Sequence, residues 1–258
     1  PLNKRLFREL RGEFGKYLVI FILMTLTIGM VSGFLVADGS MIQAYEESFK
    51  KYNIENGHFR TEKKMNNAQI QDIEHLGIKL YENYYVEEAL TNGSTMRIFK
   101  NRDEVNKVCL MKGKMPEKPG EIGIDRMYAD NNDLSVGDEI ESGGHTWKIT
   151  GLVALSDYSA LFSNNNDSMF DSVKFGVSVV CPEEFDSYKA DQLNYSYAWK
   201  YNTEPKNEKA EKDISEDLME DVAKEVTLEE FVPRYTNQAI IFTGDDMGGD
   251  RSMMIVLL

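Results

Sequence analysis

The sequence contains an uncharged run of 21 residues, from position 17 to position 37 (YLVIFILMTLTIGMVSGFLVA). As a helix rising about 1.5 Å per residue it would be about 31 Å long, which matches the roughly 30 Å hydrocarbon core of a bilayer. A core helix of a soluble protein would carry a polar stripe, whereas this run offers only two threonines and one serine. We therefore expect residues 17–37 to form a transmembrane helix in the lipid bilayer.

The charges on either side of this run predict its orientation. Five basic side chains precede it, and Asp38, Glu46 and Glu47 follow it. The positive-inside rule then places residues 1–16 in the cytoplasm and the chain after the run outside, at the plasma membrane. Within residues 2–14, apolar side chains recur every four positions between arginines. That pattern fits either a basic amphipathic segment on the inner membrane face or a flank that only orients the span.

A cleaved signal peptide is the alternative to a permanent span. The apolar region of a signal peptide usually has about 7–15 residues and ends near a small-residue pattern such as A-x-A. The run here is longer, and residues 35–37 (LVA) match that pattern poorly. Beyond it, apolar residues recur every three or four positions up to Tyr52. We expect the helix to continue as a stalk, unless residues 38–40 (DGS) break it.

The chain after the span is acidic. Residues 1–37 carry a net charge of +3 and the whole 258-residue chain −14, so the remainder carries −17. A surface of that sign repels phosphates and argues against a nucleic-acid partner. Because the sequence opens with Pro1 and stops inside an apolar run, we interpret it as a piece of a longer multi-pass protein. Residues 251–258 would then begin a second transmembrane helix.

Residues 38–250 alternate strand-like and helix-like segments, which predicts a mixed α/β extracytoplasmic domain. The predicted strands are 58–62, 78–90, 94–100, 176–180 and 194–201, with an Asn-Gly hairpin turn between the second and third. The predicted helices are 67–75, a short one from 182, and 205–226, in which Ile214, Leu218, Val222 and Val226 recur every fourth position. Residues 245–251 are polar and glycine-rich, and we interpret them as the exit from this domain into a second apolar run.

Residues 109–153 are the richest in turn signals. They predict strands at 121–125, 138–140 and 147–153 and a brief helix at 126–131, with a Gly-Gly turn at 143–144. Short strands and tight turns predict a small β-rich, barrel-like subdomain over about 109–153. The predicted fold class is therefore α+β: a transmembrane helix, a mixed α/β extracytoplasmic domain with this β-rich subdomain, and the start of a second transmembrane helix.

No pattern in the sequence indicates a catalytic or metal site. There is no phosphate-binding G-x-x-x-x-G-K-[ST] loop, no H-E-x-x-H and no G-x-S-x-G. The three histidines are scattered, which favours surface or strand-edge positions, and Tyr81, Tyr84 and Tyr85 fit a strand better than a ligand platform. Cys109 and Cys181 either pair in an oxidising compartment or act as small buried hydrophobes. We therefore predict no catalytic, cofactor-binding or metal-binding residue.

Residues 111–153 resemble the extracytoplasmic core of FtsX-like, MacB-type ABC transporter permeases. That family has a pattern close to G-[RK]-x-P-x-x-x-x-E-I-x-[IL], a short helix, G-D-x-[IL], and a strand ending in V/I-x-G. The residues that match, or that we assign to the same structural motif, are Gly113, Lys114, Pro116, Gly120, Glu121, Ile122, Ile124, Gly137, Asp138, Ile140, Ile149 and Gly151. The basic start before the first span is similar too. We interpret the glycines and proline as turn chemistry of the fold and not as a site.

The resemblance implies a permease subunit that works with a separate cytoplasmic ABC ATPase, in a dimeric assembly. ATP and Mg²⁺ would be bound by that partner, so no cofactor is expected in this chain. ATP-driven motion would act on the outer domain for export, for lipoprotein or peptide handling, or for control of the cell envelope. A membrane-tethered extracytoplasmic ligand sensor is the alternative, and an anchored hydrolase is a third reading.

Overall fold

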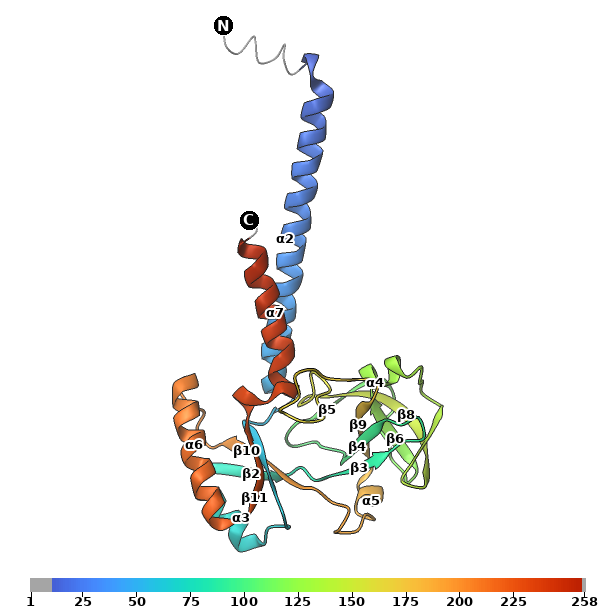
Figure 1. Ribbon diagram of the computed structural model, residues 1–258, viewed down its shortest axis with the longest axis vertical. Coiled ribbons are helices and arrows are strands. Elements are labelled where there is room, and N and C mark those ends of the chain that lie inside the picture. Colours follow the sequence, from blue (N-terminus) through green and yellow to red (C-terminus); the bar gives the residue numbers. More distant parts are fainter. Residues whose placement is uncertain (1–10, 257–258) are drawn as a thin grey trace. The chain divides into compact units, whose positions relative to one another are not determined.

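The computed structural model describes the backbone of residues 11–256 and the side chains of residues 11–249 (Figure 1). Most of the amphipathic segment predicted at 2–14 lies outside the described residues. The chain divides into two compact units. Unit 1 consists of the N-terminal part up to Glu46 and the C-terminal part from Gly244, and unit 2 is Glu47–Thr243. A long apolar helix followed by a β-rich domain confirms the predicted α+β class.

Helix α2 (Phe14–Lys51) contains the whole uncharged run and continues past it without a break. Its polar side chains bond to its own backbone. The hydroxyls of Thr25 and Thr27 donate to the carbonyls of Phe21 and Leu23 at 2.8 and 2.9 Å. The hydroxyl of Ser40 donates to the carbonyl of residue 36 at 2.9 Å, so the Asp-Gly-Ser triplet does not break the helix. Among the described residues, α2 is the one helix long and apolar enough to cross a membrane.

Helix α7 (Gln238–Val256) begins in unit 2 and ends in unit 1. The carboxamide oxygen of Asn237 accepts from the backbone N–H of Ala239 at 3.1 Å, which caps its first turn. The polar, glycine-rich exit at 245–251 is therefore helical, because a capped helix that starts earlier runs through this segment. Within unit 1, a side chain at Gly244 would overlap the ring of Tyr45, so α2 and α7 approach closely there (Figure 1). Of the predicted start of a second span, 251–256 continue α7, and 257–258 lie outside the described residues.

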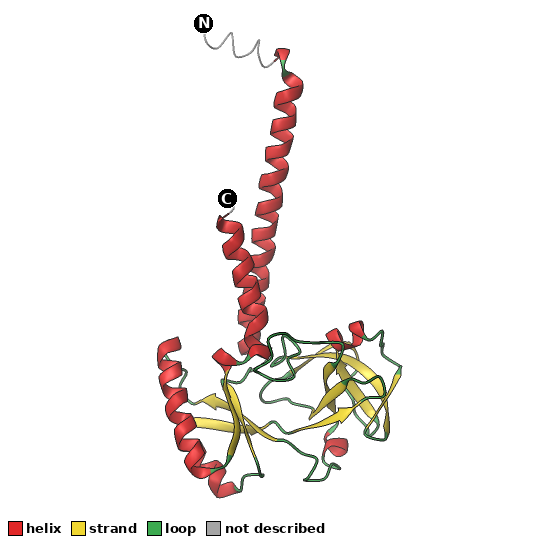
Figure 2. Cartoon of the chain, viewed as in Figure 1, coloured by secondary structure: helices red, strands yellow, loops and turns green. Residues whose placement is uncertain are grey.

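Unit 2 contains two sheets. Sheet A has four antiparallel strands in the order β11-β1-β10-β2: β11 (Leu228–Pro233), β1 (Gly57–Thr61), β10 (Tyr195–Tyr201) and β2 (Ile78–Glu82). Helices α3 (Asn67–Glu74) and α6 (Glu208–Glu225) pack against it (Figure 2). The α6 prediction is confirmed, but its buried stripe is Ser215, Leu218 and Val222, while Ile214 is 43% exposed. Positions four apart drift by about 40° around a helix per step, so a strict four-residue repeat leaves the buried face.

Sheet B has seven strands, in the order β3-β4-β9-β6-β8-β5 with β7 paired to β8. Its elements are β3 (Tyr85–Ala89), β4 (Thr95–Lys100), β5 (Val108–Gly113), β6 (Glu121–Asp125), β7 (Glu139–Ser142), β8 (His145–Leu155) and β9 (Phe175–Val180). Helix α4 (Arg126–Asn131) follows β6, as predicted, and α5 (Pro182–Phe185) and a 3₁₀ turn, η1 (Arg234–Thr236), complete the unit. The β-rich region is thus larger than 109–153, since β4 pairs with β9 in parallel, Thr95 opposite Phe175.

The chain enters sheet B from sheet A between β2 and β3. The single strand predicted at 78–90 is wrong, because Asn83 and Tyr84 interrupt it and its halves belong to different sheets. The backbone N–H of Asn83 donates to the carbonyl of Ser196 at 2.9 Å, and the hydroxyl of Tyr84 donates to that of Tyr197 at 2.7 Å. Both residues therefore bond to β10 of sheet A. Sheet B, from β3 to β9, is an insertion within sheet A.

Candidate functional site

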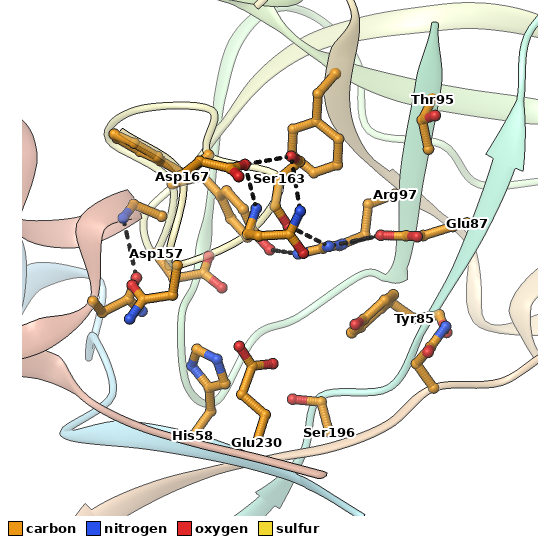
Figure 3. A pocket seen from close by; sticks show the side chains of 18 of the residues that line it. His58, Tyr85, Glu87, Thr95, Arg97, Asp157, Ser163, Asp167, Ser196 and Glu230 are labelled. Atoms are coloured by element: carbon orange, nitrogen blue, oxygen red, sulfur yellow. Dashed lines mark hydrogen bonds and ion pairs between the residues drawn. The ribbon is translucent and has the colours of Figure 1, made fainter. Parts of the chain in front are cut away.

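A cavity of about 590 Å³ lies in unit 2 between the two sheets (Figure 3). Sheet A supplies His58 from β1, Ser196 from β10 and Glu230 from β11, and these side chains lie along one side of the cavity. Sheet B supplies side chains from β3 and β4, and the segment 157–171 closes another side. Because side chains alternate across a strand, every second residue of β1, β3 and β4 projects into this space. The cavity size is typical of a small-molecule site.

Arg97 of β4 is held in this wall by hydrogen bonds and by aromatic rings. Its guanidinium donates to one carboxylate oxygen of Glu87 through Nε at 2.9 Å and Nη2 at 2.6 Å. It also donates to the hydroxyl of Tyr158 at 2.7 Å. The rings of Tyr85 and Phe175 flank it, with centroids 4.5 and 5.0 Å from the guanidinium carbon. These contacts neutralise the charge and fix the side chain, so Arg97 is pre-organised as part of the wall.

A buried polar network, of which Asn83 and Asp157 line the cavity, joins the two sheets. Arg102 donates to both carboxylate oxygens of Asp157 at 2.8 and 2.7 Å, and to the carboxamide oxygen of Asn83 at 2.8 Å. Both charged side chains are almost fully buried, with 6% and 5% of their surface exposed. Two fork-like bonds between buried groups of opposite charge hold this geometry strictly. Asn83 occupies the crossing from sheet A to sheet B, so the pair fixes that crossing.

Asn106 extends this network to β1. Its carboxamide donates to Glu55 at 2.6 Å, and its oxygen accepts from the backbone N–H of Glu55 at 2.9 Å. The other carboxylate oxygen of Glu55 lies 2.6 Å from Nδ1 of His58, whose ring faces the cavity. Arg102 always supplies one positive charge against the carboxylates of Glu55 and Asp157, and His58 supplies a second when it is protonated. The buried charges therefore balance only while His58 carries its proton.

The pKa values follow from this arrangement. Burial disfavours the charged form of both Glu55 and His58, but their mutual attraction and hydrogen bond outweigh it. The pKa of Glu55 is lowered and the pKa of His58 is raised. Burial raises the pKa of Asp157, and Arg102 offsets this only in part. His58 was predicted to be a surface or strand-edge histidine, and the structure instead places it 24% exposed in an ion pair.

Seven of the twelve motif residues were interpreted as structural, and they lie away from the cavity: Gly113, Pro116, Gly120, Glu121, Gly137, Asp138 and Gly151. Four are glycines. Gly113, Gly120 and Gly137 have positive φ, and a side chain at Gly113 or Gly151 would overlap a backbone carbonyl. The N–H of Gly120 donates to a carboxylate oxygen of Glu184 at 2.7 Å, which ties β6 to α5.

The remaining motif residues act in the same way. Pro116 is buried. The carboxylate of Glu121 accepts from the backbone N–H of Glu117 at 2.9 Å, and that bond lowers its pKa. Asp138 accepts from the N–H of Ser135 at 2.8 Å, closing the turn before β7. The four glycines, Glu121 and Asp138 therefore serve the backbone of sheet B in this structure.

The other sequence candidates separate in space. Tyr85 lines the cavity, whereas Tyr84 packs against Tyr195 and Tyr197, so the tyrosines form no common platform. Cys109 and Cys181 are both free. Among the described residues, no three His, Cys, Asp or Glu side chains are grouped as a metal site. The cavity residues were missed because two sheets contribute them from distant segments, and no local spacing marks such a set.

Comparison with known proteins found no matching family model and no matching curated protein. Two solved structures are similar in fold. The periplasmic region of MacB from Actinobacillus actinomycetemcomitans is 11% identical over 66% of this chain and 85% of its own length, with a TM-score of 0.35. The extracellular domain of the noncanonic ABC-type transporter YknZ from Gram-positive bacteria is 9% identical over 67% of this chain and 98% of its own, with a TM-score of 0.36. At these TM-scores the superposition is loose, and the proposal below depends on the chain's own residues.

Proposed function

We propose that this chain is the N-terminal part of a permease subunit of an FtsX/MacB-type ABC transporter. A separate cytoplasmic ATPase would bind ATP and Mg²⁺ and hydrolyse the nucleotide. This chain would couple that hydrolysis to motion of its extracytoplasmic domain, for export, for lipoprotein or peptide handling, or for control of the cell envelope. It would not itself be an enzyme, and it would act in a dimeric transporter in the plasma membrane.

One observation carries this proposal: unit 2 is continuous with a helix at each of its two ends. Helix α2 leads from the uncharged run into unit 2 without a break, and α7 leads out of it. A continuous helix is stiff, whereas a flexible linker behaves as a random coil and transmits displacement poorly. A domain attached in this way can respond to movement of both membrane segments. The motif at 111–153 supports the same proposal independently.

The cavity between the sheets favours a second candidate function, the membrane-tethered ligand sensor. A sensor needs a site for its ligand on the outer side and a stiff connection to the membrane. Sheets A and B form such a cavity, and α2 supplies such a connection. The two functions differ in their dependence on ATP hydrolysis, because a sensor does not require a partner ATPase.

The mechanical proposal is tested by softening α2. Six Gly/Ser residues are inserted after Ser40 in the full-length protein, which is expressed with its ATPase. The matched control carries the same insertion after Asp191, an exposed turn residue between α5 and β10. We expect the insertion in α2 to abolish the outer function while assembly and ATP turnover persist. The control should retain function. Equal function of the two proteins would contradict mechanical coupling.

A companion experiment separates the permease from the sensor. The wild-type chain is expressed with a partner ATPase that binds ATP but cannot hydrolyse it. Loss of the phenotype is expected for a permease, because its outer domain is then no longer driven. An unchanged phenotype would overturn the permease proposal and favour the sensor.

A further inference from the structure

Most charged side chains in the wall of the cavity already have an ionic partner, either in the wall or behind it. Arg97 is bonded to Glu87, and Asp157 to Arg102. Arg60 lies 2.7 Å from Glu229 and 3.8 Å from Glu230, and His58 is paired with Glu55. A charged ligand would have to break one of these pairs or enter without a counter-ion, and both are costly away from water. The wall therefore selects against net charge.

At the rim of the cavity, the charged carboxylates likewise already have hydrogen-bond partners. The carboxylate of Asp167 accepts from the hydroxyl of Ser163 at 2.8 Å, and that of Asp171 accepts from the backbone N–H groups of residues 173 and 174 at 3.1 Å. Both carboxylates are thus used to shape their own loop. Lys174 is exposed at this rim, where water screens its charge.

Several uncharged polar groups of the wall lack a partner. Among the described residues, the hydroxyl of Ser196 and the carboxamide nitrogens of Asn83 and Asn237 have none, although the three residues are 3%, 6% and 5% exposed. The hydroxyl of Thr95 also lines the cavity unpaired. The side chains of Ser196 and Thr95 are drawn on different sides of the space in Figure 3. These uncharged donors and acceptors line the cavity, so they are placed to bind a ligand from several directions.

Aromatic rings complete the wall. Five line the cavity: Tyr85, Phe99, Tyr158, Phe162 and Phe175. The surface nevertheless contains more polar than apolar side chains, so it does not match a lipid or a purely apolar ligand. Sugar rings combine the two features that this wall would recognise. Their C–H faces pack on aromatic rings, and their hydroxyls both donate and accept hydrogen bonds.

We propose that the cavity between sheets A and B binds an uncharged saccharide of one or two sugar units, held by Ser196, Thr95, Asn83 and Asn237 against the aromatic wall. This site goes beyond the permease function and does not depend on it. A zwitterionic peptide and an anionic or cationic sugar are disfavoured by the same wall, because most of its charged side chains already have an ionic partner.

The test uses the full chain in lipid nanodiscs, because many common detergents are themselves alkyl glycosides. The probe is N,N′-diacetylchitobiose, titrated calorimetrically in the absence of nucleotide and of any ATPase. The comparison probes are trialanine, glucosamine, which is cationic, and N-acetylneuraminic acid, which is anionic. We expect saturable binding of the neutral disaccharide and weaker or no binding of the other three.

Two substitutions and a matched control locate the site. Ser196→Ala and Thr95→Val each remove one unpaired hydroxyl with little change in volume, and each should weaken binding about fivefold. Together they should weaken it by about 25-fold, if the effects add. The control is Thr150→Val in β8, which removes a buried, unpaired hydroxyl outside the cavity and should leave affinity unchanged. Thermal unfolding of each variant verifies that it is folded.

Three outcomes would overturn the site. One is the absence of saturable binding of the disaccharide to the folded wild-type chain. Another is tighter binding of a charged probe or of the peptide. The third is loss of affinity in Thr150→Val but not in Ser196→Ala. None of these bears on the permease proposal, which is decided by the dependence on the ATPase.

Discussion

Removing the charge of Asp157 should destabilise unit 2 strongly. Asp157→Asn keeps the shape of the side chain but leaves the Arg102 guanidinium without its bidentate carboxylate. Arg102 is 6% exposed in its side chain, and of its three hydrogen bonds only the one to Asn83 is unaffected. Breaking a buried pair by removing one partner typically costs about 3–5 kcal/mol.

The expected cost lies at the lower end of that range, about 3 kcal/mol, for two reasons. Asparagine retains one acceptor for the guanidinium, and Glu55 still attracts the Arg102 charge within the network. Unit 2 spans Glu47–Thr243, a size at which 1 kcal/mol shifts Tm by about 2–4 °C. We therefore expect Asp157→Asn to lower Tm by about 6–12 °C. The control is Lys100→Gln, which removes an exposed ion pair to Asp186 and should cost less than about 1 kcal/mol.

The two tryptophans allow each sheet to be followed separately. Trp199 lies in sheet A and Trp147 in sheet B, and both are fully buried. Thermal and urea unfolding are measured by fluorescence in the full chain, with Trp147→Phe or Trp199→Phe as the background. In the wild-type network the two probes should unfold together. In Asp157→Asn they should separate, because the network that joins the sheets is broken.

Two results would refute this reasoning. A loss of less than about 1 kcal/mol would mean that water or another anion replaces Asp157 at no cost. Additivity would also refute it: in a double-mutant cycle with Arg102→Met, the two substitutions together should cost at least about 1 kcal/mol less than the sum of the single ones. A double variant whose cost lies within about 0.5 kcal/mol of the sum of the two single costs would show that the pair is not coupled.

Three further predictions follow from the same structure. The pKa of His58 is raised in the folded protein, so the stability that its ion pair contributes is complete below the ordinary histidine pKa of 6.5 and is lost as the pH rises through the higher folded-state pKa. His58→Gln should therefore flatten the fall of Tm measured between pH 6 and 9. Gly113→Ala should cost at least 2 kcal/mol by urea unfolding, whereas Gly120→Ala, with similar φ but open space, should cost about 1. The chain alone should show no thermal shift with Mg-ATP, and a saturable shift would contradict that.

The sequence by itself determined the elements whose signal is local. The uncharged run predicts α2, because spanning a bilayer requires one continuous apolar stretch. Helices α3 and α4 begin at capping residues, and the bounds of α3, α4 and strand β6 agree with the prediction within one residue. Three of the four motif glycines, Gly113, Gly120 and Gly137, have the positive φ that turn chemistry predicts, because positive φ is a property of a few consecutive residues.

Only the tertiary structure decided how these elements are joined and where a ligand site forms. Nothing local distinguishes β2 from β3 as members of different sheets, because the interruption at Asn83 and Tyr84 is stabilised by bonds to β10, more than 100 positions away. The same holds for the cavity, whose walls come from β1, β3, β4, β10 and β11, and for the network in which Asn106 joins Glu55 to Asp157. Local periodicity specifies which face of an element is buried. The partner against which that face is buried depends on contacts between residues distant in sequence, and a single sequence does not encode those contacts in any local pattern.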